Sequence, residues 1–372
     1  MITVPFLDLQ ASYLELSCEI DTAIKRVLAS GSYILGREVD LFEEEFSAYV
    51  EARYAVGVGN GLDALTLALR ALDIGPGDEV IVPSNTYIAT WLAVSHCGAT
   101  PIPVEPDAST YNIDTTLIEA AITPKTKAII PVHLYGHPAD LDAINAIASD
   151  HDLRIIEDAA QCHGASYKGR RIGSHSDIVA WSFYPGKNLG AFGDGGAIST
   201  NNRALAEKVR ILRNYGSPAK YVNSVIGFNS RLDDIQAAIL RVKLKHLDEW
   251  NKRRTEIAKL YSQRLFGEAL TLPIVSASVV HAWHLYVVRH PKRQQLLKLL
   301  EGKGINTLIH YPTPPGSQEA YKHLHPTCIP RKTTNLLASE IFSLPMGPHL
   351  SLAQAEYAIE CLIESLHCVE HD

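Results

Sequence analysis

The chain has 372 residues, of which 46% are apolar and 20% are charged, so it is long enough to form two domains with buried cores. Its 34 Lys and Arg against 41 Asp and Glu give a formal charge of −7, which argues against a nucleic-acid-binding surface. No apolar run reaches the roughly 18–20 residues that span a bilayer, and the first ten residues do not have the pattern of a signal peptide. We therefore expect a soluble, cytoplasmic enzyme without a membrane partner.

Residues 55–200 alternate short apolar runs with helical patterns. Several runs are apolar throughout, as strands buried on both faces of a sheet are. Between them, apolar residues at helical spacing predict helices over Leu62–Leu72 and Leu141–Ser149. This alternation predicts an α/β domain with a mostly parallel sheet. The predicted strands are Ala55–Val58, Val80–Val82, Ile102–Val104, Ala128–Val132, Arg154–Ile156, Ile178–Ser182 and Ala197–Thr200.

The pattern changes after Thr200, where long helical stretches predict a connector to a second domain. We predict a large α/β domain over residues 1–250 and a smaller α+β domain over residues 251–372. The elements expected here are helices at Arg203–Arg213 and Leu232–Trp250, a further helix that continues from 248–256 through Tyr261, a strand at His284–Val288, a helix at Lys292–Leu300, a short strand near Gly304–His310 and a closing helix from Leu352 to about Leu366.

Distinctive residues follow three of the predicted strands, at the edge where parallel sheets bind ligands. Asp158 follows one strand directly, and Lys187 lies in a Pro-Gly-Lys-Asn turn after another. An amine held among aromatic groups can have a lowered pKa and attack a carbonyl, although a solvated surface lysine is commoner. The third segment, Gly57–Gly61, leads into a helix whose free N–H groups would suit a phosphate. Leu62 occupies the third glycine position of G-x-G-x-x-G, which disfavours a dinucleotide-dependent dehydrogenase.

Together these residues match what pyridoxal 5'-phosphate requires of a protein. The cofactor needs a lysine for its Schiff base, an acid for the pyridine nitrogen, an aromatic side chain beside the ring and a helix N-terminus for its phosphate. Lys187, Asp158 and the Gly61 turn supply three of these, and Tyr87, after a further strand, is the candidate aromatic residue. Each has an ordinary structural explanation alone, but four together favour a cofactor site. The scattered cysteines predict neither a disulfide framework nor a metal site.

Seven segments carry a resemblance to a known family, the pyridoxal-phosphate-dependent sugar-nucleotide aminotransferases of the DegT–DnrJ–StrS group. The resemblance covers nearly the full length. It implies the aspartate-aminotransferase-like fold type I, with a large α/β/α domain around a mostly parallel seven-stranded sheet and a smaller C-terminal α+β domain. It also implies a homodimer whose two active sites lie at the subunit interface. The segments are Pro5–Asp8, Gly75–Val80, Val132–Gly136, Glu157–Gln161, Ser182–Gly190, Gly193–Gly196 and Gly227–Leu232.

The resemblance assigns roles to residues around the cofactor. Lys187 would be the Schiff-base lysine and catalytic proton shuttle, and Asp158 would pair with the pyridine nitrogen. Gln161 would lie near the phenolic oxygen of the ring, and Tyr87 would stack on the ring. His163, two residues after Gln161, is either an active-site neighbour or a core histidine.

The phosphate and substrate contacts follow from the same resemblance. The family usually has threonine where this chain has Leu62, so the phosphate hydroxyl contact of that residue would be missing. We expect phosphate binding by the backbone of Gly61 and Leu62, by the Ser182 hydroxyl and by Asn229 of the neighbouring subunit. Candidate substrate-binding residues are Tyr184, Lys220, Tyr221, His310 and Tyr311.

The retained lysine favours transamination, because relatives with histidine at that position are dehydratases. The resemblance implies L-glutamate as amino donor and a dTDP-linked 3-oxo-6-deoxyhexose, aminated at C3, as acceptor. The product would serve surface-polysaccharide or natural-product glycosylation. This branch is indicated by Gly304–Pro315, Ser343–Ser351 and Leu62. Two alternatives stay open: amination at C4 of a nucleotide-linked 4-oxo sugar, and a non-catalytic, pyridoxal-phosphate-binding regulatory homologue.

Overall fold

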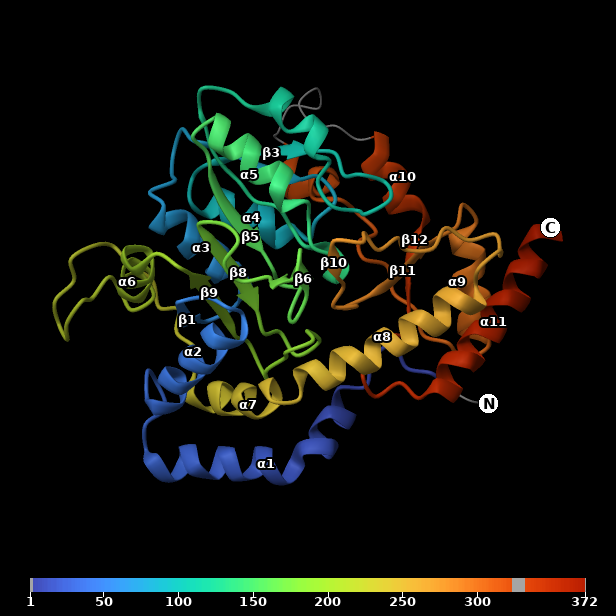
Figure 1. The fold of residues 1–372 in the computed structure, drawn as a ribbon, viewed down its shortest axis with the longest axis horizontal. Helices are drawn as coiled ribbons and strands as arrows, with labels where there is room; N and C mark the ends of the chain where they lie inside the picture. The colour runs from blue at the N-terminus through green and yellow to red at the C-terminus, as the bar shows by residue number, and fades with distance from the viewer. Residues whose placement is uncertain (1–2, 323–331, 372) are drawn as a thin grey trace.

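A mostly parallel, seven-stranded sheet forms the centre of the large domain, with the strand order β1-β9-β8-β5-β4-β2-β3 (Figure 1). The structure is a computed structural model that describes residues 3–322 and 332–371. All seven strands lie where the apolar runs predict them, with ends that differ by at most three residues. They are β1 (Tyr54–Val58), β2 (Glu79–Pro83), β3 (Thr100–Val104), β4 (Thr126–Ile129), β5 (Arg154–Asp158), β8 (Ile178–Ser182) and β9 (Gly196–Thr200).

Helices cover both faces of this sheet and complete a three-layer α/β/α domain. Those around the sheet are α2 (Arg37–Tyr49), α3 (Gly61–Ala71), α4 (Ile88–His96), α5 (Leu141–Asp150), α6 (Arg203–Leu212) and α7 (Asp234–Leu244). Successive side chains of a strand point to opposite faces. Val56 and Val58 accordingly pack in one core with α3, α4 and α6, whereas Ala55 packs in another with α2 and α7. On that second face, Ile129 packs with α5. The predicted fold class is confirmed.

Strand β9 runs against its neighbours. It pairs antiparallel with both β1 and β8, so β1 and β8 run parallel to each other. The pairs β2–β3, β2–β4, β4–β5 and β5–β8 are parallel. The carboxyl ends of β1, β2, β5 and β8 therefore lie along one edge of the sheet, which is where the candidate residues were predicted.

The smaller α+β domain follows the long helix α8 (Leu247–Arg264), which runs from the end of α7 towards the C-terminal elements (Figure 1). Its antiparallel strands β11 (Tyr286–Arg289) and β12 (Ile341–Leu344) share a core with α8, α9 (Arg293–Gly302) and α11 (Leu352–His371). The helix α10 (Lys332–Glu340) leads directly into β12. No helix in the described ranges is long and apolar enough to cross a membrane. The division at residue 250 stays a prediction.

Two predicted elements were wrong. The helix expected over Leu232–Trp250 is two helices, because the chain turns at Lys245 and His246 between α7 and α8. The short strand expected near Gly304–His310 is not formed. Instead, Ile305 and Leu308 each make an isolated bridge to a different neighbour, Val4 and Ser343, so no continuous ladder develops.

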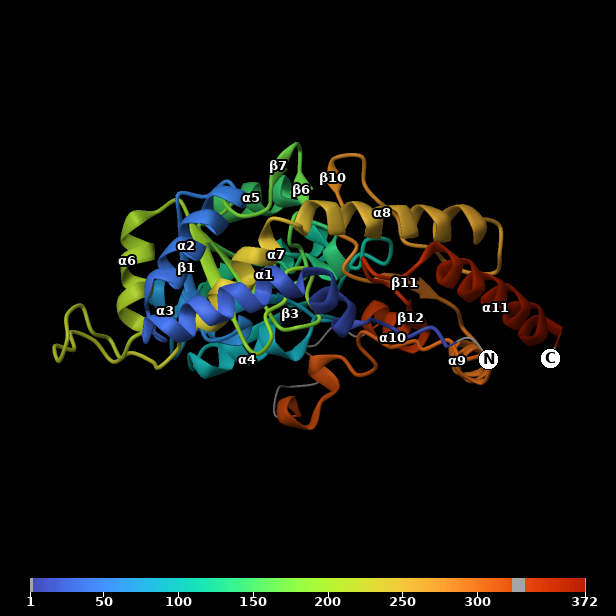
Figure 2. The ribbon, with the colours of Figure 1, turned by 90° about the horizontal axis from the view of Figure 1, so that it is seen from below.

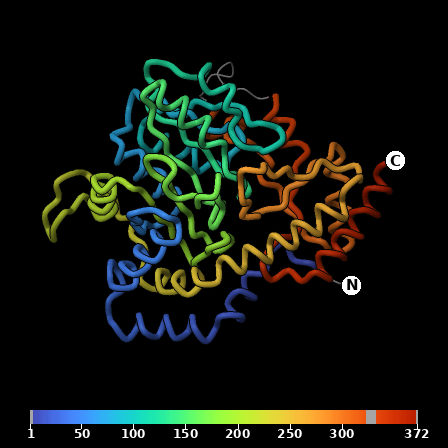
Figure 3. Tube along the Cα trace, in the orientation of Figure 1, coloured from blue at the N-terminus to red at the C-terminus, as the bar shows by residue number. Residues whose placement is uncertain are grey.

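An N-terminal helix that the sequence did not predict, α1 (Leu9–Ser30), lies along α7 (Figures 1 and 2). The Asp8 carboxylate caps its first turn, and Gly31, with φ of 69°, ends it in the left-handed conformation that glycine favours. The residues before α1 reach the smaller domain, where Val4 pairs with Ile305. Both ends of the described chain thus lie on the side of the smaller domain (Figure 3).

Candidate active site

The turn that carries Lys187 is anchored at both ends in the sheet. It leaves β8 and returns as β9, and the Phe183 N–H donates to the Gly195 carbonyl at 2.7 Å across its base. Inside it, the Lys187 N–H donates to the Tyr184 carbonyl at 2.8 Å. Burial lowers the pKa of the Lys187 amine from 10.5 to about 8, and the nearby Asp158 carboxylate opposes that shift. A substantial fraction of the amine is therefore neutral and nucleophilic near pH 7.

Asp158, the last residue of β5, is 6% exposed and held by two donors. Its Oδ2 accepts from the Thr90 hydroxyl at 2.9 Å, and its Oδ1 accepts from the Ala160 N–H at 3.2 Å. The Thr86 and Thr90 hydroxyls are 2.9 Å apart, so Thr86 is the donor that completes the chain. Burial raises the pKa of Asp158 above its usual 3.8, and the donors and Lys187 oppose that effect. A protonated ring nitrogen opposite this carboxylate would favour its ionised form.

The N-terminus of α3 faces the end of β8. Asn60 caps the helix by accepting the Asp63 N–H at 2.9 Å. A Cβ at Gly61 would lie 2.6 Å from the Ser182 Cβ, so the close approach requires glycine. Within the described residues, no hydrogen bond to the N–H of Gly61 or Leu62 is formed, and the Leu62 side chain packs against the core. These N–H groups and the Ser182 side chain lie where the anion site is predicted, and their role in binding phosphate stays a prediction.

A hydrogen-bond network joins the two domains at Gln161. Its Oε1 accepts the Tyr135 N–H at 2.6 Å, and its Nε2 donates to the Tyr311 hydroxyl at 3.1 Å. The Tyr135 hydroxyl donates to the His310 carbonyl. The Tyr311 ring lies 5.1 Å from that of Tyr87, centroid to centroid. The structure thus brings Tyr87, Gln161, His310 and Tyr311 together, as the sequence predicts.

Three histidines lie within the electrostatic reach of Lys187. Burial, followed by the charge of Lys187, lowers the pKa of His163 to about 3 and that of His310 to about 4, and puts the pKa of His284 well below 6.5. The His163 ring also packs against Trp181, with centroids 5.3 Å apart. His163 is therefore both a core residue and an active-site neighbour. All three are neutral near pH 7. The His284 and His310 rings lie within hydrogen-bond distance of Asn188 Oδ1 and Ser343 Oγ, whereas neither ring nitrogen of His163 has a partner among the described residues.

Four predicted site residues do not join this cluster. Lys220, Tyr221 and Asn229 lie on the loop after α6, which projects from the large domain in two views (Figures 1 and 2). Tyr221 is 89% exposed, and its ring is covered on one side by the Lys220 ammonium at 5.1 Å. Tyr184, next to the lysine turn, is 60% exposed. Their roles remain predictions.

Sequence reasoning missed Thr90, Tyr135 and His284. Thr90 and Tyr135 lie in segments that follow predicted strands, so their position was a usable signal. His284 comes from the smaller domain, and nothing in its sequence neighbourhood indicates a contact with the lysine turn.

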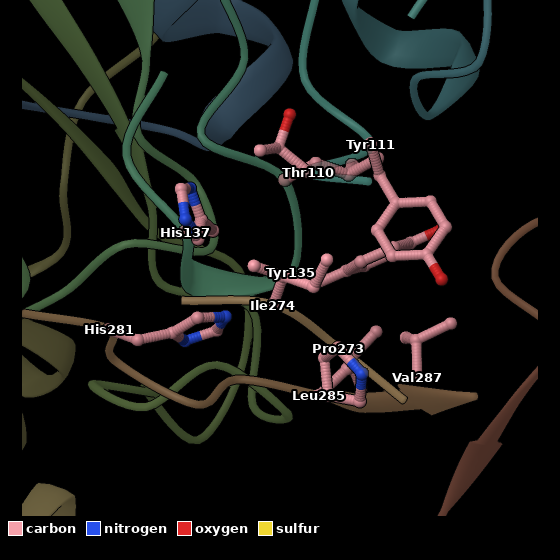
Figure 4. A pocket seen from close by; sticks show the side chains of 10 residues that line it. Thr110, Tyr111, Tyr135, His137, Pro273, Ile274, His281, Leu285 and Val287 are labelled. Atoms are coloured by element: carbon pink, nitrogen blue, oxygen red, sulfur yellow. The ribbon is translucent and has the colours of Figure 1, made fainter. Parts of the chain in front are cut away.

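A separate hollow lies beside Tyr135 (Figure 4). Its lining includes Tyr111, Leu285, His137 and His281. Burial lowers the pKa of both histidines, so the hollow is uncharged as well as largely apolar. Neither Lys187 nor Asp158 lines it, and we assign the chemistry to the sheet edge instead.

The residues at the sheet edge fit pyridoxal phosphate. The Lys187 amine, with its lowered pKa, follows β8, and the buried Asp158 carboxylate ends β5. The N-terminus of α3 follows β1, and the aromatic side chain of Tyr87 follows β2. Among the described residues, no group of three or more His, Cys, Asp or Glu side chains could hold a metal ion.

Comparison with known proteins gives a family match over most of the chain. Residues 15–363 match the DegT/DnrJ/EryC1/StrS aminotransferase family. A solved structure of S. venezuelae DesV in complex with ketimine intermediate has a TM-score of 0.96 and 53% identity, covering 98% of this chain and 99% of that one.

Three curated relatives are similar over nearly their whole length. A dTDP-3-amino-3,4,6-trideoxy-alpha-D-glucose transaminase of Streptomyces venezuelae is 54% identical, over 97% of this chain and 96% of the relative. A dTDP-3-amino-3,6-dideoxy-alpha-D-galactopyranose transaminase of Aneurinibacillus thermoaerophilus is 53% identical, over 96% and 98%. The erythromycin biosynthesis sensory transduction protein EryC1 of Saccharopolyspora erythraea is 55% identical, over 96% and 98%.

Proposed function

The chain belongs to the DegT/DnrJ/EryC1/StrS family of pyridoxal-phosphate-dependent aminotransferases, and we propose that it transfers an amino group from L-glutamate to C3 of a dTDP-linked 3-oxo-6-deoxyhexose. The observation that carries this proposal is the similarity to two transaminases named for dTDP-3-amino sugars, at 54% and 53% identity. The donor, glutamate, rests on the family resemblance.

The residues at the sheet edge have separate tasks in this reaction. Bound pyridoxal phosphate supplies an electron sink for a carbon that loses its proton. Lys187 Nζ, with a pKa near 8, can take that proton as a base and return it as an acid. The Asp158 carboxylate would pair with the ring nitrogen, and the N–H groups of Gly61 and Leu62 would hold the phosphate.

Regiochemistry distinguishes the proposal from its main alternative. The ketone must reach the reactive carbon while the nucleotide stays anchored at a distance, so C3 and C4 ketones require different tilts of the sugar. Misplacement of about 1 Å can cost about 100-fold in rate, and one pocket should therefore disfavour the other isomer.

The test offers the enzyme, with glutamate, dTDP-linked 3-oxo and 4-oxo isomers and locates the new amine by NMR. We expect an amine at C3 of the 3-oxo isomer, and none with Lys187→Ala. Amination at C4 alone would refute the proposal and favour the alternative, a 4-aminotransferase that acts on a nucleotide-linked 4-oxo sugar. The name of EryC1 motivates a second check, since a regulatory homologue that binds the cofactor would show no spectral change with glutamate.

We further propose a homodimer with shared active sites. The loop after α6 projects from the large domain (Figure 2), and its Tyr221 and Ile226 are 89% and 96% exposed. Such exposed apolar side chains on a projecting loop support contact with a second copy. Asn229 on the same loop would then reach the phosphate site of that copy.

Mixing two inactive variants tests this arrangement. If Asn229 and Lys187 of one site come from different subunits, random dimers of Asn229→Ala and Lys187→Ala regain about a quarter of wild-type activity, because half of the dimers contain one intact site of two. No recovery after subunit exchange, with each variant folded, would contradict shared sites. An active monomer in sedimentation would contradict the dimer itself.

A further inference from the structure

Asn188, the residue after Lys187, is a buried polar side chain whose partners all lie outside its own turn. It is 4% exposed. Its Nδ2 donates to Asn251 Oδ1 at 2.9 Å and to the Ala282 carbonyl at 2.7 Å, and its Oδ1 lies 3.1 Å from His284 Nδ1. Both amide hydrogens and the carbonyl oxygen are therefore used, so this side chain has one defined orientation.

That orientation also fixes the state of His284. Because Asn188 Oδ1 can only accept, His284 Nδ1 must carry a hydrogen and donate it. Burial, together with the charges of Lys187 and Arg254, places the pKa of His284 well below 6.5, so the ring is neutral with Nε2 as the acceptor. Arg254 Nη1 holds the carbonyl of His284 from α8 at 3.3 Å. The histidine is thus fixed at its backbone and at its ring.

Asn251 links the same cluster to the other side of the site. It lies on α8, one turn before Arg254, and its Nδ2 donates to the His163 carbonyl at 2.8 Å. The lysine turn, the segment after β5, the helix α8 and the segment before β11 therefore meet at two asparagine side chains. Two of these four segments belong to the large domain, and the other two lead into the smaller one.

We propose that Asn188 is a positioning residue that holds the Lys187 amine at the sheet edge where the cofactor would bind. Through its hydrogen bonds, the position of this amine then depends on how the smaller domain packs against the large one. This inference rests on the function proposed above. Among the described residues, the Lys187 backbone has one hydrogen bond within its turn, to the Tyr184 carbonyl, whereas the side chain of the next residue is bonded to Asn251, Ala282 and His284. A shift of α8 or of the segment before β11 would thus be transmitted directly to the turn that carries the amine.

The titration of Lys187 gives a readout that a merely structural role would not move. In the cofactor-free full-length protein, acetic anhydride labels neutral lysines, and mass spectrometry quantifies the peptide that contains Lys187 at each pH. In the wild type we expect a midpoint near 8. Asn188→Ala frees the turn and admits water to the amine, so the midpoint should rise towards 10.5. In the holoenzyme, kcat should fall about 10- to 100-fold with little change in KM for the nucleotide sugar.

Two further variants control for loss of stability. Asn251→Ala removes one hydrogen-bond partner of Asn188, so it should raise the Lys187 midpoint and lower kcat, each by less than Asn188→Ala does. This variant tests the proposal even if Asn188→Ala does not fold. The Asn112 side chain, in a residue 3% exposed, donates to the His137 carbonyl at 2.9 Å and accepts the Leu134 N–H at 3.0 Å, and among the described residues no hydrogen bond joins it to the lysine turn. Asn112→Ala should destabilise the protein without moving the Lys187 midpoint.

The outcomes separate this inference from the proposed function. Labelling requires neither substrate, so an enzyme that aminates no sugar refutes the function and leaves the positioning test intact. An unchanged midpoint or an unchanged kcat in both Asn188→Ala and Asn251→Ala overturns the positioning role, even if transamination is confirmed. An equal midpoint shift in Asn112→Ala overturns it as well.

Discussion

The titration of Lys187 is the property on which the chemistry depends most directly. With a pKa of about 8, roughly 9% of this amine is neutral at pH 7, against roughly 0.03% for a lysine at 10.5. The enclosed position thus makes the amine about 300-fold more available as a nucleophile at that pH. The nearby Asp158 carboxylate raises the pKa of Lys187, so Asp158→Asn should lower the midpoint below 8.

Competitive labelling measures this midpoint, with the exposed Lys127 as an internal reference in the same digest. The cofactor-free protein is labelled across pH 6–11, and the ratio of the two peptides removes the pH dependence of the reagent. A Lys187 midpoint near 10.5 would refute the argument that enclosure activates the amine. A higher midpoint in Asp158→Asn would refute the assigned effect of the carboxylate, because the neutral amide cannot stabilise the ammonium as an anion does.

Three further variants follow from the same geometry. Lys187→Met should abolish turnover yet stabilise the cofactor-free protein by about 1–2 kcal/mol at pH 7, as measured by urea unfolding. Because the pKa of Lys187 is lower in the folded protein than in the unfolded chain, this gain in stability should shrink as the pH rises from 8 to 10.5. A gain that does not change with pH would contradict the buried charge. Thr90→Val removes the hydroxyl that donates to Asp158, so it should lower the free energy of unfolding by about 1–3 kcal/mol and weaken cofactor binding. Thr90→Ser keeps the hydroxyl and should preserve both. Equal losses in the two variants would mean that packing, and not the hydroxyl, matters. Tyr311→Phe removes the acceptor of Gln161 Nε2 and should reduce kcat/KM for the sugar by about fivefold, the equivalent of about 1 kcal/mol, and an unchanged kcat/KM would show that this contact does not serve the substrate.

Much of the candidate site could be predicted because its residues follow buried strands. Asp158 and Lys187 stand at strand ends that the apolar runs mark clearly, and parallel strands bring their carboxyl ends to one edge. The direction of β9 could not be predicted, because periodicity shows that a strand is buried but not which way it runs. The break at Lys245 was missed for a similar reason, since the helical spacing of apolar residues continues across it.

Contacts between distant segments account for the rest. His284 is 97 residues from Lys187 and lies within hydrogen-bond distance of the Asn188 side chain in the lysine turn, and no local pattern encodes that pairing. The predicted strand near His310 failed because a ladder requires successive residues with one partner strand, whereas Ile305 and Leu308 bond to different segments. Side-chain hydrogen bonds such as that from Thr90 to Asp158 likewise depend on how neighbouring strands are placed.

The pairing of Val4 with Ile305 has a consequence for the order of assembly on the ribosome. Val4 is made about 300 residues before Ile305, which at about 5–20 residues per second is a delay of about 15–60 s. Once β9 has been made, the large domain has all of its strands, whereas β11 and β12 of the smaller domain are still to be made. The segment around Val4 must therefore stay without this partner until Ile305 has been made, so a segment that is made early is one of the last to dock.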